Sequence, residues 1–312
     1  MRPAGSYRHD PVAGMIRPAR LLALVPALWL GAFVLLPGLI ILKISLSSAA
    51  TAQPPYLPVL DWSAGLEGWS SFLEALDFTN FETLLSDTLY RDAALSSLAL
   101  AGLATLILAL IGTPIAHAMA RAPERAQPLL VALVIVPFWT SFLIRIYAWI
   151  AILKPEGLLS GALLRLGLVD RPLEILGTQG AILIGLTYAY LPFMVLPLYA
   201  VMARLDPHLR EAAADLGASP ARVFWSVTLP LARPGLMAGA LLCFVPMVGE
   251  FIIPDLLGGS DTLMLGRVLW SEFFSNRDWP LASAVAILML ALLVVPLVLL
   301  RDSGARPGEA GR

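Results

Sequence analysis

The stretch DPHLREAAADLGASPARVFWSVTLP, residues 206–230, decides the fold. It begins with Asp206, an acid that can cap a helix, and continues with a proline suited to the first helical position. Gly217 supplies the left-handed residue that ends this helix. Ser219 and Pro220 repeat the same start, and Pro230 predicts the end of the second helix near residue 229. The stretch therefore predicts two short helices joined by a turn.

Both predicted helices are about ten residues long, and helices of that length are not stable alone in water. Ala212, Ala213 and Ala214 make one side of the first helix nearly flat, and Glu211 beside them can reach a cation on a partner. An apolar stripe at helical spacing begins at Val223 in the second helix. Each helix is therefore expected to pack against another surface.

Long apolar blocks flank this stretch on both sides. A helix crosses the hydrocarbon core of a bilayer in roughly 20 residues, and six windows of about that length can be placed. They are residues 21–42, 93–120, 128–152, 180–203, 236–253 and 282–300. The predicted fold class is an all-α integral membrane protein with six transmembrane helices and a helix-turn-helix outside the bilayer.

Composition supports this class and excludes others. The chain is 58% hydrophobic and 14% charged, whereas about 25% of residues are charged in an ordinary soluble domain. Its one cysteine, Cys243, lies in an apolar block, and its three histidines are spread over different segments. We therefore expect no disulfide framework, metal site, redox chemistry or cofactor in this chain.

The positive-inside rule orients the spans. With six spans both termini face one side, and the segments on that side hold 13 of the 21 Lys and Arg residues. Both termini are therefore predicted to be cytoplasmic. A cleaved signal peptide is the alternative for the first span, but its apolar stretch exceeds the roughly 7 to 15 residues of a signal core.

The sequence divides into five regions. They are a cytoplasmic segment (1–20), a first transmembrane helix (21–44), an extracytoplasmic loop (45–92), a core of five transmembrane helices (93–300) that contains the loop 204–233, and a cytoplasmic tail (301–312). In the 45–92 loop, Phe72, Leu73, Leu76 and Leu84 could form a short amphipathic helix on the membrane. This loop is either a solvated connection or a docking surface for an extracytoplasmic partner.

The residues of the 206–230 stretch resemble a known motif. Glu211-Ala212-Ala213, followed at its spacing by Gly217 and by VTLP at residues 227–230, is similar to the EAA loop of binding-protein-dependent ABC importer permeases. The resemblance implies the six-helix MetI-like permease fold, in which this loop docks on a cytoplasmic ATPase. It assigns coupling to the following residues: Glu211, Ala212, Ala213, Gly217, Leu229 and Pro230.

The resemblance extends from about residue 95 to 300 and is closest to the polyamine branch, especially putrescine permeases. The stretches that carry it are PFWTSFLIR (137–145), LPFMVLP (191–197), GEFIIPDLLGG (249–259) and NRDWP (276–280). It implies a permease subunit in the bacterial inner membrane that translocates putrescine or spermidine inward by alternating access.

The chain has no G-x-x-x-x-G-K-[ST] loop, so it is expected not to be an enzyme, and ATP and Mg²⁺ are expected to act in another chain. The resemblance implies three partners besides the lipid bilayer: an ABC ATPase dimer acting on the loop, a second, related permease as in a heterodimer, and an extracytoplasmic substrate-binding protein. No nucleic acid is expected.

Charged residues inside a membrane are costly and suggest function. Glu250 lies near the outer end of the fifth predicted span with Asp255 close by, and a carboxylate there could hold an ammonium group. Aromatic side chains could add cation–π faces; the candidates are Trp139, Tyr147, Tyr188 and Tyr190. The alternatives are an ion pair of Glu250 with Arg145 or with an outer-surface residue, and interfacial anchoring by the aromatic residues. Arg145 itself is expected to reach the outer headgroups or to pair with an acid.

Other functions stay open at this level. An ABC permease for another small organic solute would share every feature above. A secondary transporter or channel predicts an inverted repeat and acids near the midplane, and neither is evident. A membrane enzyme predicts acids or histidines clustered at one face, whereas the acids here are dispersed.

Overall fold

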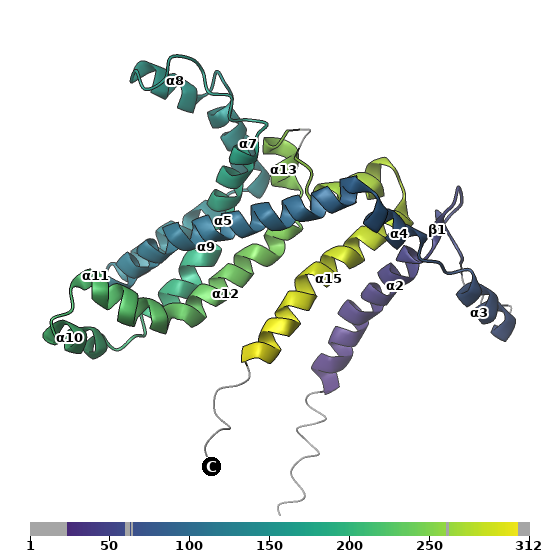
Figure 1. Cartoon of the computed structure of the whole chain (residues 1–312), viewed down its shortest axis with the longest axis horizontal. Coiled ribbons are helices and arrows are strands. Elements are labelled where there is room, and N and C mark those ends of the chain that lie inside the picture. The colour runs from purple at the N-terminus through teal and green to yellow at the C-terminus, as the bar shows by residue number, and fades with distance from the viewer. Residues whose placement is uncertain (1–23, 60–62, 64, 260–261, 305–312) are drawn as a thin grey trace, which may run out of the picture.

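The computed structural model describes residues 24–59, 63, 65–259 and 262–304, the side chains of Leu66 and of residues 295–304 excepted. The predicted segment 1–20, the start of the first predicted span and most of the predicted tail 301–312 lie outside these residues. The described chain is mostly helical, as the fold class predicted (Figure 1).

Among the described residues, four helices are long and apolar enough to cross a membrane: Leu24–Ser45, Thr88–Arg121 (α5), Gln179–Met202 (α9) and Pro220–Val248. The first contains η1 (Gly31–Leu35) and α2 (Leu36–Ser45), and the last contains α11 (Pro220–Val223), η4 (Phe224–Thr228) and α12 (Leu229–Val248). A fifth long helix, α15 (Trp279–Gly304), packs along α2 (Figure 1). At about 1.5 Å per residue, its 26 residues are also long enough to cross.

The predicted third span, 128–152, is not one helix. It consists of α6 (Gln127–Ile135), η3 (Val136–Trp139) and α7 (Phe142–Leu153). The chain bends by 88° between the helix that ends at Trp139 and the helix that begins at Phe142. Pro137 cannot donate a backbone hydrogen bond, and the Thr140 hydroxyl donates to the Pro137 carbonyl at 2.9 Å. Thr140 is extended, with a ψ of 153°. The break follows from these local preferences. The short helix α13 (Ile252–Leu257) packs beside α7.

The prediction that Pro230 ends the second helix of the 206–230 stretch is wrong. The helix continues from Pro220 to Val248, because η4 is a π-helical turn in which the Leu229 N–H donates to the Phe224 carbonyl. This wider turn changes the hydrogen-bond register just before Pro230, so the missing proline donor does not break the helix. The second helix and the predicted fifth span, 236–253, are therefore one element, which also ends earlier than predicted.

The centre of the molecule is a three-helix contact among α5, α9 and α12. Glycine residues on α12 allow this helix to approach α9 closely. A Cβ at Gly235 of α12 would lie 2.9 Å from the Pro197 carbonyl oxygen of α9, and one at Gly239 would lie 3.1 Å from the Met194 carbonyl oxygen. Backbone atoms cannot move aside as a flexible side chain can, so these two contacts hold α12 against α9 at short range.

We expect Gly235→Ala to destabilise this packing by about 1–3 kcal/mol, because the added methyl group overpacks a backbone contact. Gly102→Ala on α5 is the matched control, since a Cβ there meets nothing within 4 Å. The measurement is the thermal unfolding midpoint of the protein in detergent. Equal midpoints for the two variants would contradict the close approach.

The region between α2 and α5 forms a small folded unit. β1 (Ser48–Ala49) pairs antiparallel with β2 (Tyr56–Leu57), and two helices follow, α3 (Gly65–Glu74) and α4 (Thr79–Ser86). The apolar residues predicted for one amphipathic helix are thus divided between two, with Leu76 between them. Leu84 of α4 is buried, and α4 packs on α15 and α5.

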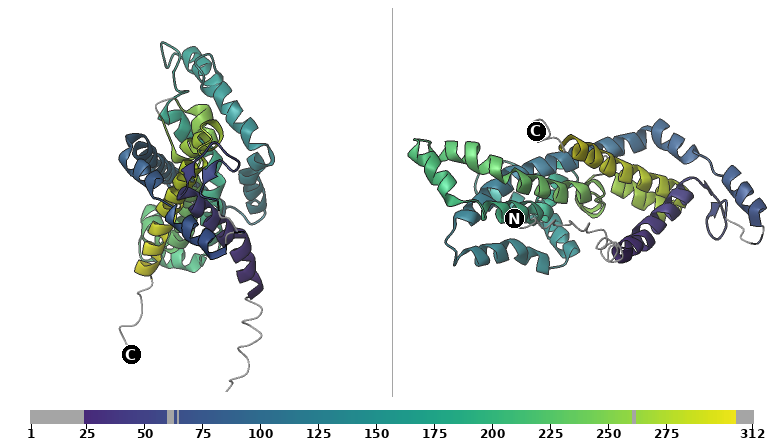
Figure 2. Two further views of the ribbon diagram at one scale, coloured as in Figure 1. Left: turned by 90° about the vertical axis from the view of Figure 1, so that its right-hand side faces the viewer. Right: turned by 90° about the horizontal axis from the view of Figure 1, so that it is seen from below.

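The remaining helices are α8 (Leu158–Arg165), α10 (Pro207–Asp215), α14 (Leu265–Trp270) and η5 (Ser271–Ser275). α8 precedes α9 and α10 follows it, so these two short helices lie at opposite ends of α9 (Figure 1). Along the longest dimension of the molecule, α10 and α3 mark the two ends (Figure 2).

Candidate functional site

The structure confirms the predicted starts of both short helices. The Asp206 carboxylate accepts the His208 N–H at 2.9 Å, with Pro207 as the first residue of α10. The Ser219 hydroxyl accepts the Arg222 N–H at 3.4 Å, with Pro220 as the first residue of α11. Side-chain caps of this kind satisfy backbone donors that have no partner inside the helix.

Gly217 ends α10 as predicted. Its φ is +82°, in the left-handed region, and a Cβ at this position would meet nothing within 4 Å. The Gly217 N–H donates to the Ala214 carbonyl at 2.8 Å, and the Ala218 N–H donates to the Ala213 carbonyl at 3.1 Å. These two bonds form a Schellman motif, which sets the sharp turn between α10 and α11.

The α10 helix is almost bare. None of its nine residues is buried, and Leu216, which caps its C-terminus, is 90% exposed. Glu211 is exposed, and its Oε2 lies 3.1 Å from His208 Nδ1. Trp225 is also exposed, and it belongs to η4, which contacts α10. A nine-residue helix is not stable by itself, so the exposed surface of α10 indicates contact with another protein.

Leu229 and Pro230 lie apart from that bare surface. Both are half-buried in the first turn of α12, where the continuous helix leaves the loop. Of the residues predicted for coupling, Glu211, Ala212, Ala213 and Gly217 therefore lie on or next to α10, whereas the other two lie in the first turn of α12.

The second candidate site surrounds Glu250. This residue was placed inside the fifth span, but α12 ends at Val248 and Glu250 lies in the short break before α13. Its Oε2 accepts a hydrogen bond from the Tyr190 hydroxyl at 2.8 Å, and its Oε1 accepts the Ile252 N–H at 3.0 Å. A carboxylate has about four acceptor positions, so two are left for a ligand.

Arg145 does not form the ion pair that was the alternative for Glu250. Among the described residues the ion pairs within 4.0 Å are His208–Glu211 and Arg267–Asp255. Arg145 is 9% exposed, and its guanidinium carbon lies 4.6 Å from the centre of the Phe138 ring. Its Nε and Nη1 atoms have no hydrogen-bond partner among these residues, so cation–π contact is its main compensation.

Tyr190 and Arg145 share an open groove of 770 Å³ between α7, α9 and α12. Its walls are otherwise apolar or aromatic: Phe138, Phe142, Ala189, Phe193, Leu241, Leu242, Val245 and Pro246. Phe193 lies at the centre of an aromatic row, 5.4 Å from the Phe138 ring and 5.9 Å from the Tyr190 ring. Sequence reasoning gave Phe138 no role, because a phenylalanine in an apolar segment carries no distinguishing signal.

The other candidates for the substrate path are not gathered there. Asp255 pairs with Arg267 at 3.3 Å. Trp139 is 82% exposed and Tyr147 is also exposed, as suits residues facing lipid or another subunit. Tyr188 makes an edge-to-face contact with Trp149 at 5.4 Å. The structure therefore brings Glu250 together with Tyr190 and leaves the remaining four residues outside this cluster.

A buried acid was missed. Glu272 of η5 accepts hydrogen bonds from the Tyr90 hydroxyl at 3.0 Å and from the Asn276 amide at 2.8 Å. It holds the start of α15 against α5. No clear signal was available, because Glu272 lies in a stretch of mixed polarity, WSEFFSNRD (270–278), and its partner Tyr90 lies 182 residues away.

Comparison with known proteins agrees with this architecture. The family model described as "Binding-protein-dependent transport system inner membrane component" matches residues 110–303, more than half of the chain. The spermidine/putrescine transport system permease proteins PotB of Haemophilus influenzae and Escherichia coli K12 are each 40% identical over 85% of this chain, covering 88% and 90% of their own lengths.

A solved structure has the same fold. It is the crystal structure of a bacterial alginate ABC transporter in complex with alginate pentasaccharide-bound periplasmic protein, with a TM-score of 0.69 and 17% identity. The match covers 97% of this chain and 100% of that one. By sequence match and by fold, this chain belongs to the family of inner membrane permease components of binding-protein-dependent ABC transport systems.

Proposed function

We propose that this chain is the permease subunit of an ATP-driven importer that carries a polyamine, putrescine or spermidine, into the bacterial cytoplasm. The observation that carries the proposal is the bare helix α10, held in place by its caps and the Gly217 turn at the start of a continuous membrane helix. A rigid lever of this kind lets a motor protein that pushes α10 move α12 directly.

The motor in this proposal is a dimer of a separate ABC ATPase, where ATP and Mg²⁺ would act. Leu216 is the anchor we assign to the contact, because an exposed leucine at the end of a helix can enter an apolar groove. Glu211 lies one helical turn and a residue before it and is available to a cation of the same partner. Both chain termini would then be cytoplasmic.

A second permease, related to this chain, would complete the pathway. The groove beside Tyr190 is open and lined by exposed apolar residues of α12, such as Leu241 and Leu242. Its one cation, Arg145, has free donors. Alternating access would follow as a rigid-body movement of the two permeases against each other, and an extracytoplasmic binding protein would deliver the substrate.

The polyamine assignment is supported by relatives and by chemistry. The relatives named for spermidine and putrescine are 40% identical, whereas one named for molybdenum, from Mycobacterium bovis, is 32% identical over 74% of this chain. A half-buried carboxylate beside the Tyr190 ring suits an organic ammonium group. Another small organic cation would fit the same groups, so binding of putrescine, spermidine and agmatine by the partner binding protein tests this point.

We expect Leu216→Ser to weaken copurification of the ATPase by roughly tenfold or more, because burying a leucine side chain contributes about 1.5–3 kcal/mol. The matched control is Leu166→Ser. Leu166 caps α8 as Leu216 caps α10, is 71% exposed and lies at the other end of α9. The measurement is the ATPase retained on the tagged permease after washing.

Retention that is the same in the two leucine variants would argue against α10 as the docking helix. If no ATPase is retained by the unmodified chain either, the importer assignment fails and an ATP-independent transporter becomes the better reading.

A further inference from the structure

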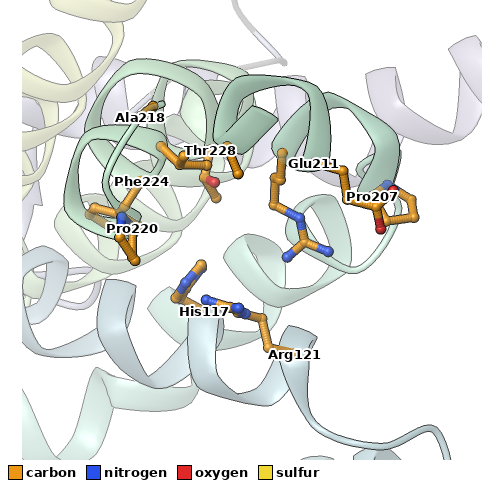
Figure 3. Close-up of a pocket in the computed structure, with 11 residues that line it drawn as sticks. His117, Arg121, Pro207, Glu211, Ala218, Pro220, Phe224 and Thr228 are labelled. Atoms are coloured by element: carbon orange, nitrogen blue, oxygen red, sulfur yellow. The ribbon is translucent and has the colours of Figure 1, made fainter. Parts of the chain in front are cut away.

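A cavity of 370 Å³ lies between the cytoplasmic end of α5 and the loop that carries α10 and α11. Figure 3 shows side chains from both parts of the chain around it: His117 and Arg121 on α5 face Glu211, Phe224 and Thr228 across the space. Four residues of α10, Glu211 among them, line one side of the cavity, whereas Leu216, the proposed anchor for the ATPase, does not line it.

The lining carries more positive than negative charge. The guanidinium groups of Arg121 and Arg210 line the cavity beside the His117 ring, against one carboxylate, that of Glu211. Among the described residues neither arginine has an ion-pair partner within 4.0 Å, and the Glu211 carboxylate lies 3.1 Å from His208 Nδ1 instead. Two arginines without an ion pair favour binding of an anion.

A buried hydroxyl in the wall has no partner. Thr228 is 2% exposed and lines the cavity, and its Oγ1 makes no hydrogen bond with the described residues. A buried hydroxyl without a hydrogen bond costs roughly 1–3 kcal/mol, so such groups normally have a ligand or an ordered water molecule. An oxyanion would accept from this hydroxyl and from both arginines at once.

The depth of the cavity indicates the source of the anion. α5 has 34 residues and is about 51 Å long, whereas the hydrocarbon core is about 30 Å thick. Counted inward from Asp92, about 20 residues span the core, so His117 and Arg121 lie among the cytoplasmic headgroups. Basic pockets at this level bind the phosphates of anionic lipids.

We propose that this cavity binds the phosphate group of an anionic phospholipid from the cytoplasmic leaflet, with Arg121, Arg210 and Thr228 as its donors. The bound phosphate joins α5 to the loop and limits the angles that α10 adopts. Binding itself does not depend on the proposed transport function; only its effect on coupling does.

The test is lipid binding to the chain purified from membranes, with whatever subunits copurify, measured by native mass spectrometry during titration with phosphatidylglycerol. Arg121→Gln and Arg210→Gln are each expected to weaken binding about tenfold, and Thr228→Val severalfold, while phosphatidylcholine binds poorly throughout. Arg222→Gln is the matched control, because Arg222 is exposed on α11 and does not line the cavity.

Two results would overturn the site: equal losses for Arg222→Gln and Arg210→Gln, or unchanged binding by Thr228→Val, since either assigns the effect to surface charge. A competition arm separates the two sources of phosphate. Inorganic phosphate is expected not to displace phosphatidylglycerol at millimolar concentration. Displacement would overturn the lipid assignment and identify a site for soluble phosphate.

Discussion

Replacement of Gly217 by valine is expected to lower substrate uptake by roughly 5- to 30-fold. The residue has a φ of +82°, and the left-handed conformation costs an L-residue about 1–2 kcal/mol, more for a β-branched one. A factor of about 5 to 30 in an equilibrium corresponds to one or two kcal/mol. Because α10 buries none of its residues and contacts only short neighbouring elements such as α11 and η4, little packing holds the turn in place against this strain.

The structure offers a control with the same local geometry. Gly167 ends α8 with a φ of +67°, its N–H donates to the Leu164 carbonyl at 3.1 Å, and the Leu168 N–H donates to the Leu163 carbonyl at 3.0 Å. A Cβ meets nothing within 4 Å at either glycine. Gly167→Val therefore applies the same backbone strain at the other end of α9, where no motor is expected.

Uptake of radiolabelled putrescine into cells, normalised to permease in the membrane, distinguishes the two variants. We expect a large loss for Gly217→Val together with reduced ATPase copurification, and uptake near normal for Gly167→Val. Equal losses would mean that the glycine turn serves only stability, and unchanged uptake in both would refute the lever mechanism.

Glu250→Gln is expected to reduce uptake by roughly ten- to a hundredfold while the complex still assembles. Hydrogen bonds to charged groups contribute about 1.5–3 kcal/mol, and about 1.36 kcal/mol corresponds to tenfold in rate. Glutamine keeps the shape of the side chain: its amide oxygen can still accept the Ile252 N–H, and its amide nitrogen can donate to the Tyr190 hydroxyl oxygen, so the break between α12 and α13 is retained. What it loses is the negative charge opposite the ammonium group.

Two further variants separate charge from structure. Tyr190→Phe removes the hydroxyl that orients Glu250 but keeps the aromatic face, so a smaller loss is expected. Asp255→Asn removes an acid that is 56% exposed and already paired with Arg267, and uptake should remain near normal. Transport kinetics that are the same for Glu250→Gln and the unmodified chain would reject a role for the carboxylate in the pathway.

Prediction succeeded where the deciding interactions are local. The starts at Asp206 and Ser219 and the stop at Gly217 depend on residues within three or four positions of one another, so their identities are enough. Prediction failed at Pro230, which leaves its helix continuous because η4 is a π-helical turn.

The Glu250 site was also predictable only in part. The carboxylate could be recognised as unusual from its apolar surroundings, but its partner Tyr190 is 60 residues away on another helix. Arg145 was expected to reach the headgroups or an acid, and instead it lies buried against Phe138. Neither partner can be chosen from sequence, because many aromatic residues in the spans are equivalent until the helices are packed.

The sequence by itself determined the membrane environment, the long apolar helices and the capped turn after Met202, because hydropathy and capping act over one helix or one turn. Only the tertiary structure decided which carboxylate meets which hydroxyl and which cations lack a partner. Those outcomes depend on which polar groups are packed together, and neighbours are set by packing between segments far apart in the chain.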